Sequence, residues 1–230
     1  MQLINDDIFI IIPAYNEKLA IRKVVLSLHA QDYKNIILID DGSDQNIFEE
    51  IQDLHVHYLK HYINLGQGAA LQTGFCYALK QGANICVTFD ADGQHSAEDI
   101  GRLITPIREN KADIVLGSRF LLKKESNVPI GRKLILKLAR FVNFCFSGLL
   151  LTDAHNGLKA LSKNVLEKIF LEENRMSHAS EILMEVSKHK FRFLEVPVNI
   201  HYSAYTIQKG QKNFDSLKIL YDLILFKLFK

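Results

Sequence analysis

Two carboxylates separated by one residue, Asp90 and Asp92, are the feature of this sequence that most directly indicates chemistry. They follow a short apolar run typical of a strand, so both side chains are expected beyond the end of that strand. Carboxylate oxygens are the ligands that hard divalent cations prefer. A bound Mg²⁺ or Mn²⁺ at this point would bridge and neutralise two phosphates. The same pair also fits an ordinary acidic turn between a strand and a helix.

A second acidic pair, Asp40 and Asp41, ends a neighbouring apolar run. We predict that Asp41 accepts hydrogen bonds from a base N–H or from ribose hydroxyls, whereas Asp40 fits a structural role equally well. Tyr15 and Glu17 follow the first apolar run. The Tyr15 ring would lie beside a base, and Glu17 would accept from base or ribose groups or favour the start of a helix through the helix dipole.

Two further candidates follow later in the chain. Arg119 comes after a buried run and a Gly-Ser turn, where a guanidinium would clamp phosphate, with a surface ion pair as the alternative. Asp153 lies in the segment Thr-Asp-Ala-His-Asn-Gly and is a candidate general base or acceptor-orienting group. A turn that links helices explains the same segment equally well.

Glycines 66, 68 and 74 resemble part of a dinucleotide-binding fingerprint, but Leu71 occupies its third glycine position and the segment follows the third strand. We therefore exclude an NAD site. Gly68 and its neighbours are instead expected to let a loop and a helix N-terminus pack close to the sheet, with backbone N–H groups near a nucleotide.

The elements that must position these residues alternate between β-like and amphipathic segments. This rhythm is typical of a parallel sheet with crossover helices, an α/β fold. The five expected strands, all buried on both faces, cover residues 8–12, 36–39, 56–59, 85–89 and 113–117. The expected helices cover residues 19–30, 47–54, 69–81 and 96–109, the last with a capping box formed by Ser96 and Asp99. Ligands of such sheets bind beyond the carboxyl ends of the strands, which is where the polar residues lie.

The second half of the chain is less regular. We expect a helix over 132–147, a strand over 158–161, a helix over 178–188, a strand over 193–202, a basic loop and a final amphipathic helix. We predict a single domain, 1–230. It divides into a nucleotide-binding half (1–120), an acceptor-side half (121–213) and a C-terminal helix (214–230).

Composition excludes several classes of protein. Lys and Arg number 28 against 26 Asp and Glu, a balance that gives no basic face for nucleic acid. Three cysteines without a CxxC spacing indicate reduced thiols and a cytoplasmic setting. Charged and polar residues interrupt the apolar tracts 134–151 and 217–229, so neither is expected to span a membrane. The last helix would contact a membrane surface peripherally, pack in the core or form a homo-oligomer contact.

Six motifs occur in order: IIPAYNE, IDDGSD, NLGQGAALQTG, FDADGQH, LGSR and TDAHNGLKAL. Together they resemble glycosyltransferase family 2, particularly its dolichyl-phosphate mannose synthase-like branch, from residue 8 to about residue 161. The resemblance implies a GT-A fold with a mixed, mainly parallel sheet, and a Mg²⁺ or Mn²⁺ cofactor. It also implies inverting transfer from a nucleotide diphosphate sugar to a lipid-phosphate or saccharide acceptor, in cell-envelope polysaccharide or glycolipid synthesis.

The resemblance also implies roles for individual positions. Asp153 would lie near the acceptor and Arg119 would contact phosphate. In the family a late basic loop closes over the diphosphate, which corresponds here to Lys209 and Lys212. The nucleoside would contact Pro13, Ala14, Tyr15, Glu17 and Asp41, and the metal and diphosphate would be surrounded by Asp90, Ala91, Asp92 and Gln94. The chain departs from the family pattern at Gln67, where a basic residue is frequent, and at Leu158 and Lys159, which replace an aromatic residue and an arginine.

Several alternatives remain open at this point. An acceptor that is a lipid phosphate is already anionic, whereas a sugar hydroxyl needs a base, for which Asp153 is the candidate. The chain would otherwise be a catalytically silent nucleotide-binding partner. A sugar nucleotidyltransferase is a further alternative, although the sequence lacks its glycine- and arginine-rich N-terminal loop.

Overall fold

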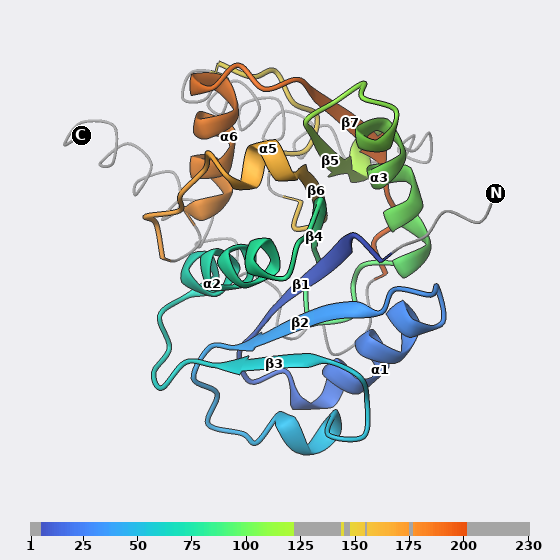
Figure 1. Ribbon diagram of the computed structural model, residues 1–230, viewed down its shortest axis with the longest axis vertical. Coiled ribbons are helices and arrows are strands. Elements are labelled where there is room, and N and C mark those ends of the chain that lie inside the picture. Colours follow the sequence, from blue (N-terminus) through green and yellow to red (C-terminus); the bar gives the residue numbers. More distant parts are fainter. Residues whose placement is uncertain (1–5, 122–143, 145–147, 155, 175–176, 202–230) are drawn as a thin grey trace, which may run out of the picture.

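The computed structural model describes residues 6–121, 144, 148–154, 156–174 and 177–201 (Figure 1). The expected helix over 132–147, the basic loop with Lys209 and Lys212, and the C-terminal helix over 214–230 lie outside the described residues or almost entirely so. Within the described residues, no helix combines the length and apolar character that a membrane span needs.

One seven-stranded sheet organises the described chain, with strand order β3-β2-β1-β4-β6-β5-β7. The strands are β1 (Ile8–Ala14), β2 (Asn35–Asp40), β3 (His57–Lys60), β4 (Ile85–Thr88), β5 (Ile114–Ser118), β6 (Lys159–Ser162) and β7 (Phe193–Pro197). β6 pairs antiparallel with β4 and β5, and every other pairing is parallel. The predicted mixed, mainly parallel sheet and its first five strands are confirmed.

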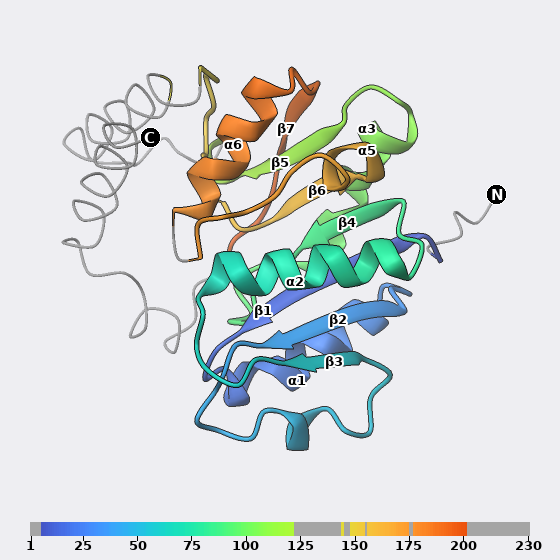
Figure 2. The same cartoon turned by 60° about the vertical axis from the view of Figure 1, so that its left-hand side comes forward.

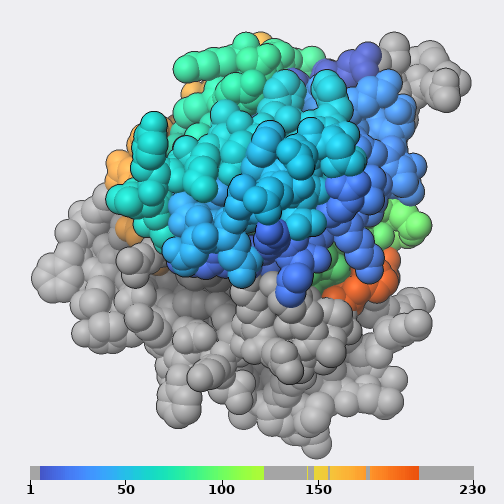
Figure 3. All heavy atoms as spheres, turned by 90° about the horizontal axis from the view of Figure 1, so that it is seen from below, coloured from blue at the N-terminus to red at the C-terminus, as the bar shows by residue number. Residues whose placement is uncertain are grey.

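Helices cover both faces of this sheet (Figures 1 and 2). The helices are α1 (Lys18–His29), α2 (Gln67–Lys80), α3 (Ile100–Arg108), α5 (Lys163–Leu166) and α6 (His178–Lys188). Three short 3-10 turns are η1 (Phe48–Glu50), η2 (Ala97–Asp99) and η3 (Arg119–Leu121). Figure 3 shows the same molecule from below as space-filling spheres, and the blue and cyan segments of the N-terminal part form a continuous surface.

The alternation of side chains along β1 explains why its sequence is apolar throughout. Ile10 and Ile12 pack into a core with α1 and α3, whereas Phe9 and Ile11 pack into a second core with α2, α5 and α6. A parallel strand covered on both faces needs no polar positions, so a continuous apolar run is the expected pattern. Two cores on one sheet hold the carboxyl ends of the central strands rigidly in place.

Four predictions about elements are wrong in detail. The segment 47–54 forms only the short turn η1, where Arg22 donates to the Glu50 carbonyl and pairs with Asp53. β3 lies at the edge of the sheet and is half-buried, and β7 ends at residue 197 instead of 202. Ser96 does cap its turn by accepting from the Glu98 N–H, but the Asp99 carboxylate accepts from the Asn199 backbone and from Arg102 instead of completing a capping box.

Candidate functional site

A cavity of about 600 Å³ lies beyond the carboxyl ends of β1, β2 and β4, beside the start of α2. This volume is within the range of small-molecule sites. Its lining contains most of the residues predicted from the sequence: Pro13, Ala14, Tyr15, Glu17, Asp41, Asp90, Ala91 and Asp92. It also contains Asn64, Gly66 and Gln67. The cavity lies where the strand order changes direction, because β1 is followed by β2 on one side and borders β4 on the other.

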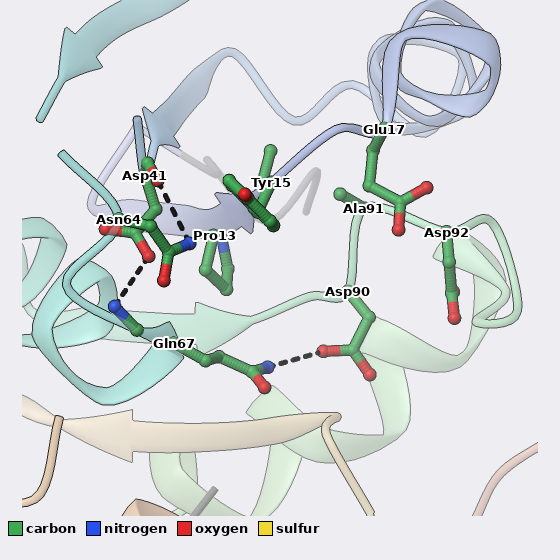
Figure 4. A pocket seen from close by; sticks show the side chains of 11 residues that line it. Pro13, Tyr15, Glu17, Asp41, Asn64, Gln67, Asp90, Ala91 and Asp92 are labelled. Carbon is green, nitrogen blue, oxygen red and sulfur yellow. Dashed lines mark hydrogen bonds between the residues drawn. The ribbon is translucent and has the colours of Figure 1, made fainter. Parts of the chain in front are cut away.

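The cavity has two chemically different ends (Figure 4). Asp41 and Asn64 lie at one end, Glu17 and Asp92 lie at the other, and the Tyr15 ring lies between them. The separation suits an elongated ligand whose two ends differ in polarity and charge.

Asp41 is fixed by the loop that follows β3. Its carboxylate accepts from the backbone N–H groups of Leu65 (3.0 Å) and Gly66 (2.7 Å), and the His61 ring nitrogen lies 2.7 Å from it. The Asn64 side chain donates to the Asp41 carbonyl. Asp41 is only 3% exposed, so these contacts set its direction before any ligand binds.

The loop that wraps Asp41 can approach so closely because of Gly42. This residue has a φ of 71°, and a Cβ there would lie 2.4 Å from the Ile63 carbonyl carbon. Asp40, in contrast, points into the fold, where it accepts from Ser43 N–H and the Tyr58 hydroxyl. Asp41 thus faces the cavity, whereas Asp40 stabilises the fold through these hydrogen bonds.

Asp90 is held on both carboxylate oxygens. Gln67 Nε2 donates to Oδ1 at 3.2 Å, and His95 Nε2 lies 2.9 Å from Oδ2 (Figure 4 shows the first contact). Gly157 packs so closely that a Cβ there would lie 2.1 Å from Oδ2. Burial raises the pKa of Asp90, but the hydrogen bond and charge of His95 and the charge of Lys159 outweigh it, and the net pKa is lowered. Asp90 is therefore an oriented anion.

Asp92 has a different environment. Its Oδ1 accepts from the Gln94 backbone N–H at 2.9 Å, and no other group of the described residues donates to this carboxylate. Burial raises the pKa of Asp92 above its usual value, and the neighbouring Asp90 charge adds to this effect. A cation bound to Asp92 would relieve both penalties.

The donor set fits a divalent cation that is shared with a ligand. Among the described residues, no group of three or more His, Cys, Asp and Glu side chains gathers as a complete metal cage. Mg²⁺ is commonly held by one or two carboxylates together with substrate phosphates. Asp92, with Asp90 beside it, would supply that kind of partial coordination.

Arg119 and Asp153 contact each other directly. The guanidinium binds the carboxylate through two N–H groups, at 2.7 and 2.8 Å, and the Arg119 backbone N–H adds a third contact. Burial raises the pKa of Asp153, but the Arg119 hydrogen bonds and charge more than compensate, so its pKa is lowered. Neither residue lines the cavity.

The structure places the remaining predicted residues as follows. Gly68 lies in the first turn of α2, where its N–H donates to the Asn174 carbonyl and a Cβ would lie 1.9 Å from the Glu173 carbonyl oxygen. It therefore provides close packing, as expected, while its N–H is already engaged. Gln94 is outside the cavity lining and contacts Asp92 through its backbone.

Sequence reasoning missed four contributors to this site. Asn64 follows the third strand, and ligands of such sheets bind beyond the carboxyl ends of the strands, so its position alone could have identified it. Gln67 and Lys159 were noted only as departures from the family pattern. His95 was given no role from the sequence, and the structure buries it against Asp90.

Comparison with known proteins agrees with this geometry. The model of glycosyl transferase family 2 matches residues 9–170. The chain is 36% identical over 243 residues to a UDP-N-acetylglucosamine–dolichyl-phosphate N-acetylglucosaminyltransferase of Methanococcus voltae, covering 97% of each chain. It is 29% identical over 200 residues to a polyprenol monophosphomannose synthase of Mycolicibacterium smegmatis, covering 82% of this chain and 75% of the relative.

Solved structures share the fold. Glucosyl-3-phosphoglycerate synthase from Mycobacterium tuberculosis, solved with Mn²⁺, uridine diphosphate and glucosyl-3-phosphoglycerate, superposes with a TM-score of 0.70 at 16% identity. The match covers 94% of this chain and 77% of that one. The expected GT-A fold is confirmed. Family membership also selects a glycosyltransferase over the nucleotidyltransferase and the silent partner considered above. Because the family model matches residues 9–170 and the relative is 36% identical over 97% of this chain, the chain belongs to glycosyl transferase family 2.

Proposed function

We propose that the chain transfers a sugar from a nucleoside diphosphate to the phosphate of a lipid acceptor, with inversion at the anomeric carbon. The observation that supports this acceptor most strongly is the ion pair of Asp153 with Arg119. A carboxylate with a lowered pKa and two guanidinium hydrogen bonds is a weak proton acceptor near neutral pH. A phosphate acceptor is already anionic and needs no base.

The two ends of the cavity support a direction for the donor. The base and ribose would lie at the Asp41 and Asn64 end, beside the Tyr15 ring, and the diphosphate would lie at the Asp92 end. The Asp41 carboxylate would accept a ring N–H such as that of uracil, thymine or guanine. Pro13, Ala14, Glu17 and Ala91 would complete the walls.

Mg²⁺ or Mn²⁺, when bound with the donor, would neutralise charge on the departing diphosphate. Asp92 would be its principal protein ligand, since its Oδ1 accepts from the Gln94 N–H whereas its Oδ2 accepts from no other described side chain. Asp90 would face the same region in a fixed direction because Gln67 and His95 hold it. Arg119, which holds Asp153, would also contact an acceptor or donor phosphate.

The names of the relatives support the same acceptor class, since one acts on dolichyl phosphate and another is a polyprenol monophosphomannose synthase. We retain the proposed division into a donor half (1–120), an acceptor half (121–213) and a C-terminal helix (214–230), within one domain. We also retain Lys209 and Lys212 as diphosphate contacts, a Gln94 contribution to the metal, and peripheral membrane contact of a cytoplasmic protein.

Two experiments test this function. The first is a thermal-shift series with UDP, GDP, CDP and dTDP, each with and without Mn²⁺, because a ligand that binds the native state raises its stability. We expect a metal-dependent shift for one nucleotide with a ring N–H and none for CDP. A folded protein that responds to no nucleotide would contradict the donor site.

The second experiment compares acceptors with the donor identified by the first. Farnesyl phosphate and the matched alcohol farnesol differ only in the phosphate group, so mass spectrometry of their products isolates its contribution. We expect glycosylation of the phosphate and none of the alcohol. Transfer to a free saccharide with no transfer to farnesyl phosphate would overturn the proposed acceptor.

A further inference from the structure

Lys159 is a buried lysine that pairs in the sheet with Thr88 of β4, two residues before Asp90. It begins β6, is 4% exposed, and its ammonium group donates to the Asn156 carbonyl. This acceptor is neutral, and the charge of the ammonium group interacts with the carboxylates of Asp90 and Asp153. Burying an ammonium group costs several kcal/mol unless opposite charges lie near it, so these two carboxylates explain why a lysine is tolerated at this position.

The distribution of charge around Lys159 is uneven. Arg119 already neutralises Asp153 through a two-pronged ion pair at 2.7 and 2.8 Å. Asp90 has a different set of partners, namely the neutral Gln67 amide, the His95 ring and the charges of Lys159 and His178. The charge of Lys159 is therefore available chiefly to offset Asp90, which lies beside Asp92.

We propose that Lys159 is a positioning residue that acts as an internal counter-ion, so that the pair Asp90 and Asp92 binds a divalent cation strongly only together with a diphosphate. Without a ligand, one fixed positive charge opposes the entry of a doubly charged cation into a site with two carboxylates. A diphosphate adds the negative charge that compensates both cations. The diphosphate part of this inference rests on the proposed function.

A second consequence concerns geometry. The Asn156 carbonyl that Lys159 binds belongs to the same turn as Gly157, whose backbone packs against Asp90. A lysine that only fixed this turn would influence stability, whereas a counter-ion also influences the affinity of the empty site for a cation. The two roles are therefore distinguishable by measuring metal binding directly.

The test is calorimetric titration of Mn²⁺ into the full chain, with and without UDP, for the wild type, Lys159→Met and Lys159→Arg. Removing one buried charge next to the site is expected to strengthen Mn²⁺ binding without nucleotide by about tenfold or more. The increase in Mn²⁺ affinity caused by UDP should shrink in Lys159→Met. Lys159→Arg keeps the charge and should behave like the wild type.

An unchanged Mn²⁺ affinity in folded Lys159→Met, within twofold of the wild type, would overturn the proposal and leave only a structural role. Circular dichroism establishes folding, and Lys159→Gln, which can still donate to a carbonyl, replaces the methionine variant if that variant does not fold. Should none of UDP, GDP and dTDP bind the wild type, the proposed function would fail. The comparison of Mn²⁺ affinities without nucleotide would still decide the role of Lys159.

Discussion

Replacing Gly157 by alanine should move Asp90 and thereby reduce catalysis. The added Cβ would lie 2.1 Å from Asp90 Oδ2 and 2.6 Å from Cγ, whereas ordinary contact begins at 3.4 Å. The carboxylate must therefore retreat by about 1 Å, since the Gly157 backbone is itself held by the Thr88 hydroxyl at its carbonyl. Displacements of this size typically reduce rates by about a hundredfold. We expect that loss in kcat/KM.

The matched control is Gly101→Ala, because a Cβ at Gly101 in α3 meets no atom within 4 Å. Initial rates of transfer to farnesyl phosphate, together with melting curves, separate a local effect from unfolding. Gly157→Ala should retain a cooperative melting transition, with a cost of about 1–3 kcal/mol for the overpacked contact. If this variant keeps more than half of the wild-type kcat/KM, the reasoning that Asp90 must be held in this position is refuted.

Three further predictions follow from the same site. Asp92→Asn should abolish the metal dependence of the nucleotide thermal shift and reduce transfer about hundredfold; an unchanged metal dependence would remove Asp92 from the metal site. Gly42→Ala, with φ of 71° and a Cβ 2.4 Å from the Ile63 carbonyl carbon, should weaken UDP binding about tenfold by calorimetry, and an unaltered dissociation constant would contradict this. Asp153→Asn should lower the free energy of unfolding at neutral pH by about 2 kcal/mol, because it leaves Arg119 without its carboxylate. The pKa of Asp153 is lowered in the fold, so the extra stability of the wild type over the variant is complete above the unfolded-state pKa of about 3.9. This extra stability disappears as the pH falls through the folded-state pKa. Urea unfolding at several pH values measures the difference.

The central part of the fold is predictable because its signals are local. Each parallel strand buried on both faces is a continuous apolar run, so β1 and β4 are recognisable without knowledge of their partners. The position of polar residues after such runs then predicts their convergence, and Tyr15, Asp41 and Asp92 do line one cavity. The apolar runs and the polar residues that follow them are therefore sufficient to predict these strands and this part of the cavity lining.

The rest of the site depends on contacts between distant segments. The pairing of Arg119 with Asp153 joins residues 34 positions apart, and the Gln67 contact with Asp90 spans 23 positions. No local pattern reports that these side chains already satisfy one another. The sequence therefore indicated a phosphate clamp and a base as separate groups, whereas the structure joins them in one ion pair.

The antiparallel strand β6 has a consequence for the order in which the sheet can form. β3, β2, β1 and β4 pair through successive crossovers within the first 88 residues, but β5 reaches β4 only through β6, which ends at Ser162. Pairings with long sequence separation form late because closing the intervening chain costs entropy. During synthesis the strands that carry Asp41 and Asp90 can therefore pair before Gly157 leaves the ribosome, and the contact that holds Asp90 in place forms later than the strands around it.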